Sequence, residues 1–265
     1  MIKVLVSVSL VFVTLYCALV LFLYITQRAH LYFPNVQRPE PSADPEIVEV
    51  ETHDDVALRA WYYAPRVEGR PVIVYFHGNA GHYGDRLYKA WDYIEDGYGV
   101  LLAEYRGYGG NEGSPSEDGL YSDGRAYIEW LYHEHDLDAS DIVLYGESLG
   151  TGIATQMATE YDVKALILET PFSSMVELAQ TRYFFAPVFL LLKDKYMSID
   201  KIDDVNTPIL IMHGHKDEVI PYEFARKLYD NAKEPKKFVD FPLANHNNLY
   251  EYGASQDVLE FLRGL

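Results

Sequence analysis

The chain has 265 residues, 49% of them apolar, which is enough to bury the core of one large α/β domain. Its formal net charge of -18 argues against a nucleic-acid partner, because phosphate recognition needs clustered Lys and Arg. The one cysteine, Cys17, excludes an internal disulfide framework and a zinc site built on cysteines.

The first predicted element is a membrane anchor over residues 1–27. Residues 4–25 carry no charge, and a helix needs about 20 apolar residues to cross the hydrocarbon layer. A signal peptide would have a shorter apolar stretch and a small-residue cleavage site, whereas this run ends in bulky residues. A cleaved signal peptide and a buried core helix are the alternatives. A lipoprotein with Cys17 as the lipid-bearing residue is disfavoured by the large Tyr16 before it.

The charges that flank the anchor say little about its orientation. Lys3 and the amino terminus on one side oppose Arg28 and Arg38 on the other, and the positive-inside rule needs a clearer bias. We expect a single-pass membrane protein and favour the non-cytoplasmic side for the folded domain.

Residues 28–46 are expected to form a tether, because their second half is polar and rich in proline. The folded domain then covers residues 47–265, where short β-branched and aromatic runs alternate with longer amphipathic stretches. Helices are expected at residues 83–96, 116–135, 149–161, 222–232 and 255–265. Strands are expected at residues 47–51, 56–64, 71–78, 99–107, 141–146, 165–170, 208–214 and 236–241.

Most of the later strand runs are continuously apolar, which is typical of parallel strands covered on both faces. Residues 56–64 alternate more like an antiparallel edge strand. The pattern therefore predicts an α/β fold: a mostly parallel eight-stranded sheet with helices on both faces, preceded by one transmembrane helix.

Residues 173–200 interrupt the alternation of strands and helices. They are too long for a simple connection and are unusually apolar between Tyr183 and Leu192. One interpretation is a crossover helix packed on the sheet. The other is a small cap over an acyl pocket, or a surface that touches the bilayer.

The stretch IVLYGESLGTGIA, residues 142–154, contains a Gly-x-Ser-x-Gly sequence between a predicted strand and a predicted helix. This arrangement is typical of a nucleophile elbow, a turn so tight that only glycine fits beside the serine. The elbow presents the serine hydroxyl at the carboxyl edge of the sheet. Ser148 is therefore the predicted nucleophile.

A serine hydroxyl needs a general base, and the base needs a carboxylate that orients it. In a fold of this kind the chain order is serine, acid, histidine. Asp217 follows the strand run at residues 208–214, with Glu218 beside it as an alternative acid and Glu169 as a remoter one. His246 follows the last strand run and is the predicted base.

The negative charge of a tetrahedral intermediate requires backbone donors. One expected donor is the amide of Leu149, directly after the nucleophile. The other should come from the glycine-rich loop after the strand at residues 71–78, with Asn79 as first choice and Ala80 as the alternative.

Two further motifs suggest other chemistry. HGHKD, residues 213–217, has the His-x-His-x-Asp spacing of a metal-dependent hydrolase, but no supporting series of ligands accompanies it, so we expect no metal. GYGGNEG, residues 107–113, lacks the Gly-x-Gly-x-x-Gly spacing of a nucleotide loop and is expected to border the active-site edge.

The chain resembles the α/β-hydrolase superfamily, and within it the N-terminally membrane-anchored serine hydrolases of the α/β-hydrolase-domain group. The resemblance covers nearly the whole chain and rests on the blocks HLYFP, YFHGNAG, EYRGYGGNEGSPSEDGLYSD, GESLGTGIA, LILETPF and GHKDEVIP. It implies Ser148 as nucleophile, Asp217 in preference to Glu218 as acid, His246 as base, oxyanion contacts near Asn79 and Leu149, and no cofactor.

One departure from the family pattern lies around the base. The usual glycine before the histidine and aspartate two residues after it are Asn245 and Asn248 here. The base itself is present, so the change bears on how its loop is held.

We therefore expect a membrane-anchored serine hydrolase that cleaves carboxylic esters or thioesters through an acyl-enzyme at Ser148. The apolar residues 184–192 would suit a lipid-like acyl chain. One alternative is a serine peptidase of the acyl-peptide type, which would usually need a second domain or a larger cap. The other is a non-catalytic, membrane-tethered binding module, which would be expected to carry a broken triad.

Overall fold

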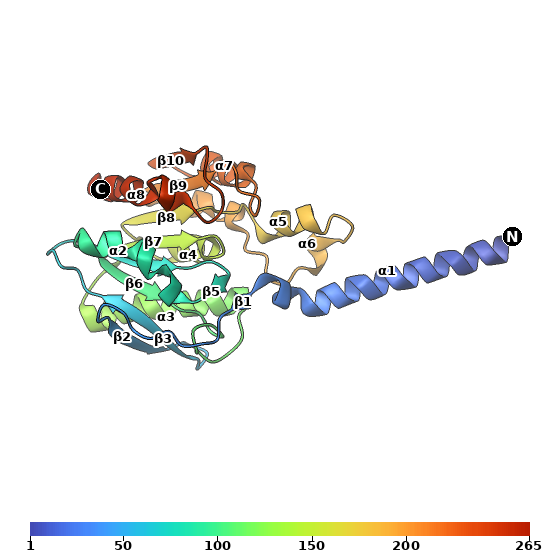
Figure 1. Ribbon diagram of the computed structural model, residues 1–265, viewed down its shortest axis with the longest axis horizontal. Helices are drawn as coiled ribbons and strands as arrows, with labels where there is room; N and C mark the ends of the chain where they lie inside the picture. The colour runs from blue at the N-terminus through green and yellow to red at the C-terminus, as the bar shows by residue number, and fades with distance from the viewer.

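An eight-stranded sheet forms the centre of the structure, a computed structural model that describes residues 1–265 (Figure 1). In spatial order the strands are β10 (Lys236–Phe241), β9 (Ile209–Gly214), β8 (Ala165–Glu169), β7 (Ile142–Glu147), β4 (Val72–Phe76), β6 (Gly99–Ala103), β3 (Ala57–Tyr63) and β2 (Glu46–Glu51).

The predicted mostly parallel sheet is confirmed. Strand β3 runs antiparallel to both of its neighbours, and every other pair is parallel. The central strands are buried along almost their whole length because helices cover both faces, which explains their continuous apolar runs. Two predicted strands end early, at Phe76 and Ala103, so the residues that follow are free to form loops at the carboxyl edge.

The five predicted helices are confirmed and lie on both faces of the sheet (Figure 1). Alternate residues of β4 show the division: Val74 packs into one hydrophobic cluster and Tyr75 into the other. The first cluster includes side chains of α3 (Glu117–His135), α4 (Gly150–Glu160) and α7 (Tyr222–Asn231), and the second those of α2 (Leu87–Glu95) and α8 (Ala254–Arg263).

The shorter elements lie in the connections between these layers. A two-stranded parallel ladder joins β1 (Phe33–Pro34) to β5 (Ala80–Gly81). The 3-10 turns are η1 (Tyr83–Arg86), η2 (Ala139–Asp141), η3 (Ser198–Asp200), η4 (Ile202–Asp204) and η5 (Leu249–Tyr252).

Helix α1 (Ile2–Leu31) projects away from the sheet (Figure 1). It is long and apolar enough to cross a membrane, and none of its residues is buried. The alternative of a buried core helix is therefore wrong. A single-pass anchor fits this helix.

The segment predicted as a tether, residues 28–46, is held against the domain instead of hanging free. Its first residues continue α1 to Leu31, and Phe33 and Pro34 then pair with Ala80 and Gly81. Further along, the Gly109 amide donates to the carbonyl oxygen of a residue in this segment, Asn35. These partners are distant in sequence, so the polar, proline-rich composition gave no sign of them.

Residues 173–200 form two short helices, α5 (Met175–Arg182) and α6 (Val188–Leu191), followed by η3. The α5–α6 segment, residues 175–192, lies beyond the edge of the sheet and beside the C-terminal half of α1 (Figure 1). The interpretation as one crossover helix packed on the sheet is therefore wrong.

Candidate active site

Ser148 occupies the turn between β7 and α4. Its φ of 50° lies in the left-handed region, which is costly for a residue with a side chain. The glycines on either side are steric requirements. A Cβ at Gly150 would lie 2.0 Å from the Phe76 carbonyl oxygen, and one at Gly146 would lie 2.6 Å from the Gly150 carbonyl oxygen. The turn has the geometry of a nucleophile elbow.

The three residues predicted as a triad lie together at the carboxyl edge of the sheet. His246 Nε2 lies 3.0 Å from Ser148 Oγ, and His246 Nδ1 lies 2.7 Å from Asp217 Oδ2. Ser148 follows β7, Asp217 follows β9 and His246 follows β10, so loops after three strands supply the three side chains. Both contacts are within hydrogen-bonding distance.

The Asp217 side chain is buried, and both of its carboxylate oxygens have hydrogen-bond partners. Its Oδ1 accepts hydrogen bonds from the amides of Val219 and Ile220, each at 2.8 Å. Burial opposes ionisation of this carboxyl, but the hydrogen bond and charge of His246 outweigh it, so its pKa lies below the usual value of 3.8. The carboxylate is thus ionised and fixed beside the imidazole at neutral pH.

His213 lies next to this carboxylate. Its Nε2 is 3.0 Å from the Ile220 carbonyl oxygen and 3.4 Å from Asp217 Oδ2. Burial lowers the pKa of His213, so the ring is neutral at pH 7 and its Nε2–H donates to the carbonyl. The HGHKD motif therefore separates in space, because His215 is exposed and contacts Asp240 at 2.9 Å.

The alternative acids lie elsewhere. Glu218 is exposed and makes no hydrogen bond to His246. Glu169 is fully buried in β8, where its carboxylate accepts from Lys89 Nζ and from the Tyr145 hydroxyl. The structure brings Asp217, and neither glutamate, to the histidine.

The two asparagines that depart from the family pattern hold the histidine loop. Asn248 Oδ1 accepts from the Asn245 amide at 2.8 Å, and Asn245 Oδ1 accepts from the Asn247 amide at 2.9 Å. Both side-chain bonds to the backbone span His246 and close a tight turn around it. The two asparagine side chains therefore restrain the backbone around His246.

The two predicted oxyanion donors lie beside the serine hydroxyl. Leu149 and Asn79 line the same cavity as Ser148, and neither backbone amide donates a hydrogen bond within the protein. The side chain of Asn79 points elsewhere, because its Nδ2 donates to the Leu31 carbonyl oxygen at 2.8 Å. Two backbone N–H groups without partners in the protein therefore belong to residues that line the cavity at Ser148.

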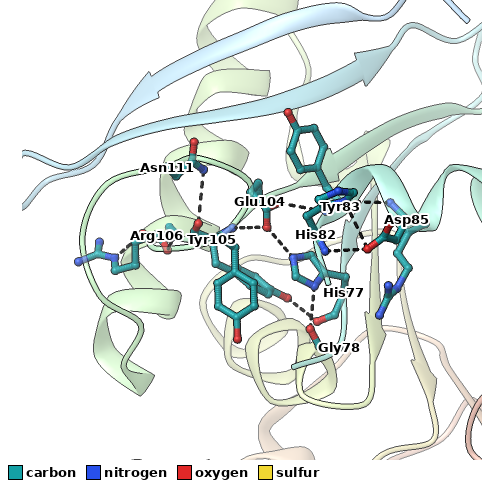
Figure 2. Close-up of polar contacts among 12 residues, drawn as sticks. His77, Gly78, His82, Tyr83, Asp85, Glu104, Tyr105, Arg106 and Asn111 are labelled. Atoms are coloured by element: carbon teal, nitrogen blue, oxygen red, sulfur yellow. Dashed lines mark hydrogen bonds and ion pairs between the residues drawn. The ribbon is translucent and has the colours of Figure 1, made fainter. Parts of the chain in front are cut away.

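A buried polar cluster supports the loop that carries Asn79, as Figure 2 shows. His77 and Glu104 are buried and lie 2.7 Å apart, and the other ring nitrogen of His77 lies 2.7 Å from the Gly78 carbonyl oxygen. Glu104 also accepts from the amides of Tyr83 and Tyr105. The loop after β4 is thus fixed by a residue that follows β6.

The glycine-rich loop at residues 107–113 contacts the same place. The Tyr108 hydroxyl donates to the Asn79 carbonyl oxygen at 2.9 Å. Gly109 has a φ of 53°, and a Cβ there would lie 2.2 Å from Glu104 Oε2. This loop therefore borders the candidate site.

A second charged cluster lies next to Ser148. Arg86 and Lys89 lie 2.9 and 3.4 Å from the carboxylate of Glu147, the residue before Ser148. Burial opposes ionisation of Glu147, but the two cations outweigh it and hold its pKa well below the usual range. Sequence reasoning missed both charged clusters, because the partners come from different strands and helices. The only sequence signal is the presence of His77, Glu104 and Glu147 at strand ends.

An apolar cavity of about 580 Å³ opens from Ser148. On one side it is lined by α1 and the residues that follow it, including Leu23 and Leu31. On another side it is lined by the α5–α6 segment, including Ala179 and Leu191. Seventeen of its 22 lining residues are hydrophobic, and a volume of this size suits a small-molecule ligand. The contribution of α1 to this wall was not predicted.

Comparisons with known proteins agree with the fold. The family described as "alpha/beta hydrolase fold" matches residues 71–201. The uncharacterized protein Rv2307c of Mycobacterium tuberculosis is 39% identical over 236 residues, which cover 86% of this chain and 83% of that protein. Protein bem46 of Schizosaccharomyces pombe is 33% identical over 247 residues, covering 86% and 82%.

Two further similar proteins, one relative and one solved structure, are named for an activity. The lysophosphatidylserine lipase ABHD12 of Danio rerio is 31% identical over 236 residues, covering 77% of this chain and 61% of that protein. Among solved structures, the Pyrococcus furiosus esterase Pf2001 superposes with a TM-score of 0.72 at 19% identity, covering 87% of this chain and 98% of that chain. The second likeness concerns the fold alone.

Proposed function

This chain belongs to the α/β-hydrolase superfamily, in its ABHD-like subgroup, and on that premise we propose that it is a serine hydrolase cleaving carboxylic esters or thioesters. One observation carries the proposal. His246 bridges Ser148 Oγ at 3.0 Å and Asp217 Oδ2 at 2.7 Å, on a turn that has a nucleophile-elbow geometry.

The reaction follows from these contacts. His246 Nε2 takes the proton of the Ser148 hydroxyl while Oγ attacks the acyl carbonyl carbon, and the carbonyl oxygen becomes negatively charged. The amides of Leu149 and Asn79 donate to that oxygen. The protonated His246 then gives its proton to the departing alcohol or thiol, which leaves an acyl-enzyme on Ser148.

Water then hydrolyses the acyl-enzyme, again with His246 as base and then as acid. His246 accepts a proton from water as the hydroxide oxygen attacks the acyl carbon, and it returns that proton to Ser148 Oγ as the carboxylic acid leaves. Asp217 keeps the imidazole in the required tautomer and stabilises its cation. Every catalytic group in this cycle belongs to the chain, so the proposed mechanism uses no cofactor and no metal.

The shape of the cavity supports a lipid-like acyl chain as substrate. Its walls are mostly hydrophobic, and they include helix α1, which fits a membrane anchor. The zebrafish relative is described as a lysophosphatidylserine lipase, which also supports a lipid ester. The domain arrangement proposed with this function is an anchor, a connecting segment and a catalytic domain with a small cap at residues 173–200. We propose the non-cytoplasmic side for that domain.

The test is labelling of the full-length protein with a fluorophosphonate probe, which reacts with activated serines. We expect label on the wild type and none on Ser148→Ala or His246→Ala, while Ser140→Ala, a change in an exposed turn, stays labelled. A folded wild type that stays unlabelled would contradict the proposal. The non-catalytic binding module would then be the better account.

A further inference from the structure

The α5–α6 segment carries a dense group of exposed apolar side chains. Phe184, Phe189 and Leu190 are 79%, 61% and 76% exposed, and Phe185 beside them is 39% exposed. Other exposed apolar residues outside α1 are scattered over the surface. A contiguous apolar patch of this kind indicates a surface that another apolar phase covers.

The patch is attached to α1 at two levels. The Tyr16 hydroxyl donates to the Phe185 carbonyl oxygen at 2.9 Å, and Gln27 Nε2 donates to the Leu191 carbonyl oxygen at 3.3 Å. With a rise of about 1.5 Å per residue, these levels lie roughly 16 Å apart along the helix. The α5–α6 segment therefore runs beside α1 over about half the thickness of a bilayer.

The first charged residue at the end of α1 indicates how deep in a bilayer the contact between Tyr16 and Phe185 would lie. The first charged residue after the uncharged run is Arg28, whose guanidinium pairs with Asp194 through two hydrogen bonds of 2.8 and 3.0 Å. With Arg28 at the membrane surface, Tyr16 lies about 18 Å deeper along the helix, near the middle of a hydrocarbon layer of about 30 Å. Phe185 lies at the same depth because its backbone contacts Tyr16.

The sequence of the segment suits this depth. No charge lies between Tyr183 and Leu192, whereas Arg182 precedes and Lys193 and Lys195 follow the run. Long basic side chains at the ends of an apolar stretch reach the headgroup level. The arrangement is that of an element dipping into a bilayer and returning.

Backbone groups inside lipid must find partners within the protein. The amides of Tyr183, Ala186 and Val188 donate to carbonyl oxygens of the same segment, and the amides of residues 190–192 do likewise. Pro187 has no amide hydrogen, and the Phe185 carbonyl oxygen accepts from Tyr16. Most of the polar backbone of this short, irregular element is thus satisfied.

We propose that the α5–α6 segment is inserted in the hydrocarbon layer beside α1, so that the cavity between them admits an acyl chain directly from the bilayer. Parts of both walls of the entry, α1 at Val20 and Leu23 and the segment at Ala186, lie at hydrocarbon depth, whereas Leu191 lies near the membrane surface at the level of Gln27. The proposal of insertion depends only on the exposed apolar side chains of the segment and on its contacts with α1. Entry of a substrate chain rests in addition on the proposed hydrolase function.

Insertion is tested with nitroxide labels on the full-length protein in phosphatidylcholine vesicles. Native Cys17, next to Tyr16 on α1, reports the depth of the anchor. In a Cys17→Ser background, Phe184→Cys and Leu190→Cys report the segment, and Tyr88→Cys, 63% exposed on α2, reports an aqueous surface.

We expect labels at positions 184 and 190 both to collide with oxygen and to be shielded from a water-soluble nickel complex. The label at position 88 should show the reverse. The label at 184 should collide with oxygen as often as the label at Cys17, and the label at 190, near the level of Gln27, less often. Labels at 184 and 190 that behave like the one at 88 would overturn the proposal, as would a Cys17 label exposed to nickel.

Entry is tested with Phe184→Gln combined with Leu190→Gln, two residues that do not line the cavity. We expect hydrolysis of a soluble butyrate ester to stay within twofold of wild type and hydrolysis of a long-chain ester in vesicles to fall at least tenfold. The control pair Val67→Gln and Tyr88→Gln, also exposed apolar residues, should change neither rate.

The outcomes separate the two proposals. Equal loss of both rates, or no loss of the vesicle rate, would overturn entry from the bilayer. A wild type that cleaves neither ester would overturn the hydrolase function on which entry depends, and the nitroxide depths would still decide insertion.

Discussion

The candidate site joins two regions that are built differently. Its polar region consists of loops at the carboxyl edge of the sheet, where each side chain has several partners: Asp217 accepts from His246 and two amides, and Glu104 contacts His77 and two amides. Its apolar region consists of α1 and the α5–α6 segment, which are joined by hydrogen bonds from Tyr16 and Gln27 and, just after the segment, by the Arg28–Asp194 ion pair.

The difference indicates a division of roles. Catalysis requires groups held within a fraction of an ångström, and the strand ends supply that rigidity. Binding of an acyl chain requires only apolar surface, which the hydrophobic side chains of this wall supply. Changes in the polar region should therefore affect all substrates alike, whereas changes in the apolar wall should affect substrates by chain length.

The largest effect is expected in the polar region. Asp217→Asn keeps the shape of the side chain but disturbs the tautomer and charge support of His246, so kcat should fall about 10,000-fold for every ester. Steady-state rates with a series of p-nitrophenyl esters measure this. A loss confined to long chains would contradict the division of roles.

The same carboxylate gives a pH dependence of stability. Because the folded pKa of Asp217 lies below its usual value of 3.8, the unfolded chain binds the proton more readily. The stabilisation that the Asp217 carboxylate adds to the free energy of unfolding is complete above about pH 4. It is lost as the pH falls through the lower pKa that Asp217 has in the folded protein. The Tm difference between wild type and Asp217→Asn should therefore shrink on acidification. A difference that grows below pH 4 would show that the carboxylate is not stabilised in this way.

Glu104→Ala should destabilise the polar region next. It leaves the buried His77 ring and the Tyr83 amide without their acceptor, which should cost about 3 kcal/mol of unfolding free energy. Urea denaturation measures the change. Glu112→Ala, an exposed carboxylate in the neighbouring loop, should cost less than about 0.5 kcal/mol. Equal costs would mean that the buried cluster does not hold the loop.

A smaller and selective effect is expected in the apolar region. Ala179→Trp places a large ring in the cavity wall, so kcat/KM for long acyl chains should fall about tenfold while butyrate is unaffected. Thr181→Trp, exposed on the same helix, should leave the chain-length profile unchanged. An equal loss for all chain lengths would indicate that this wall also positions the catalytic groups.

The smallest effect concerns the strained turn. Ser148→Gly should raise the free energy of unfolding by about 1 kcal/mol over Ser148→Ala, because only glycine adopts the left-handed conformation without strain. Thermal denaturation of the two inactive variants gives the comparison. A less stable glycine variant would mean that the elbow stores no strain.

The sequence predicted the sheet well and the apolar wall poorly, for a physical reason. Strand runs and the Gly-x-Ser-x-Gly turn are local patterns, so the eight strands of the sheet and the place of Ser148 could be predicted. The order of acid and base along the chain predicted that His246 would meet an acid after the strand at residues 208–214, and the family resemblance favoured Asp217 over Glu218. Their catalytic role stays a prediction.

Contacts between distant segments left no such pattern. The pairing of Phe33 with Ala80 and the bond between Asn79 and Leu31 join residues far apart in the chain. The apolar composition of residues 173–200 fits a helix packed on the sheet as well as a segment beside α1, so the composition does not predict which one forms. Only the three-dimensional structure distinguishes these arrangements.

The central claim is that Ser148 carries the acyl group during turnover. The most direct test is mass spectrometry of the full-length protein, quenched in acid after brief mixing with a p-nitrophenyl ester. We predict an added mass equal to the acyl group, located on the peptide that contains Ser148 and missing in Ser148→Ala. Turnover of the ester with no acyl group on Ser148, or with the acyl group on another residue, would contradict the account.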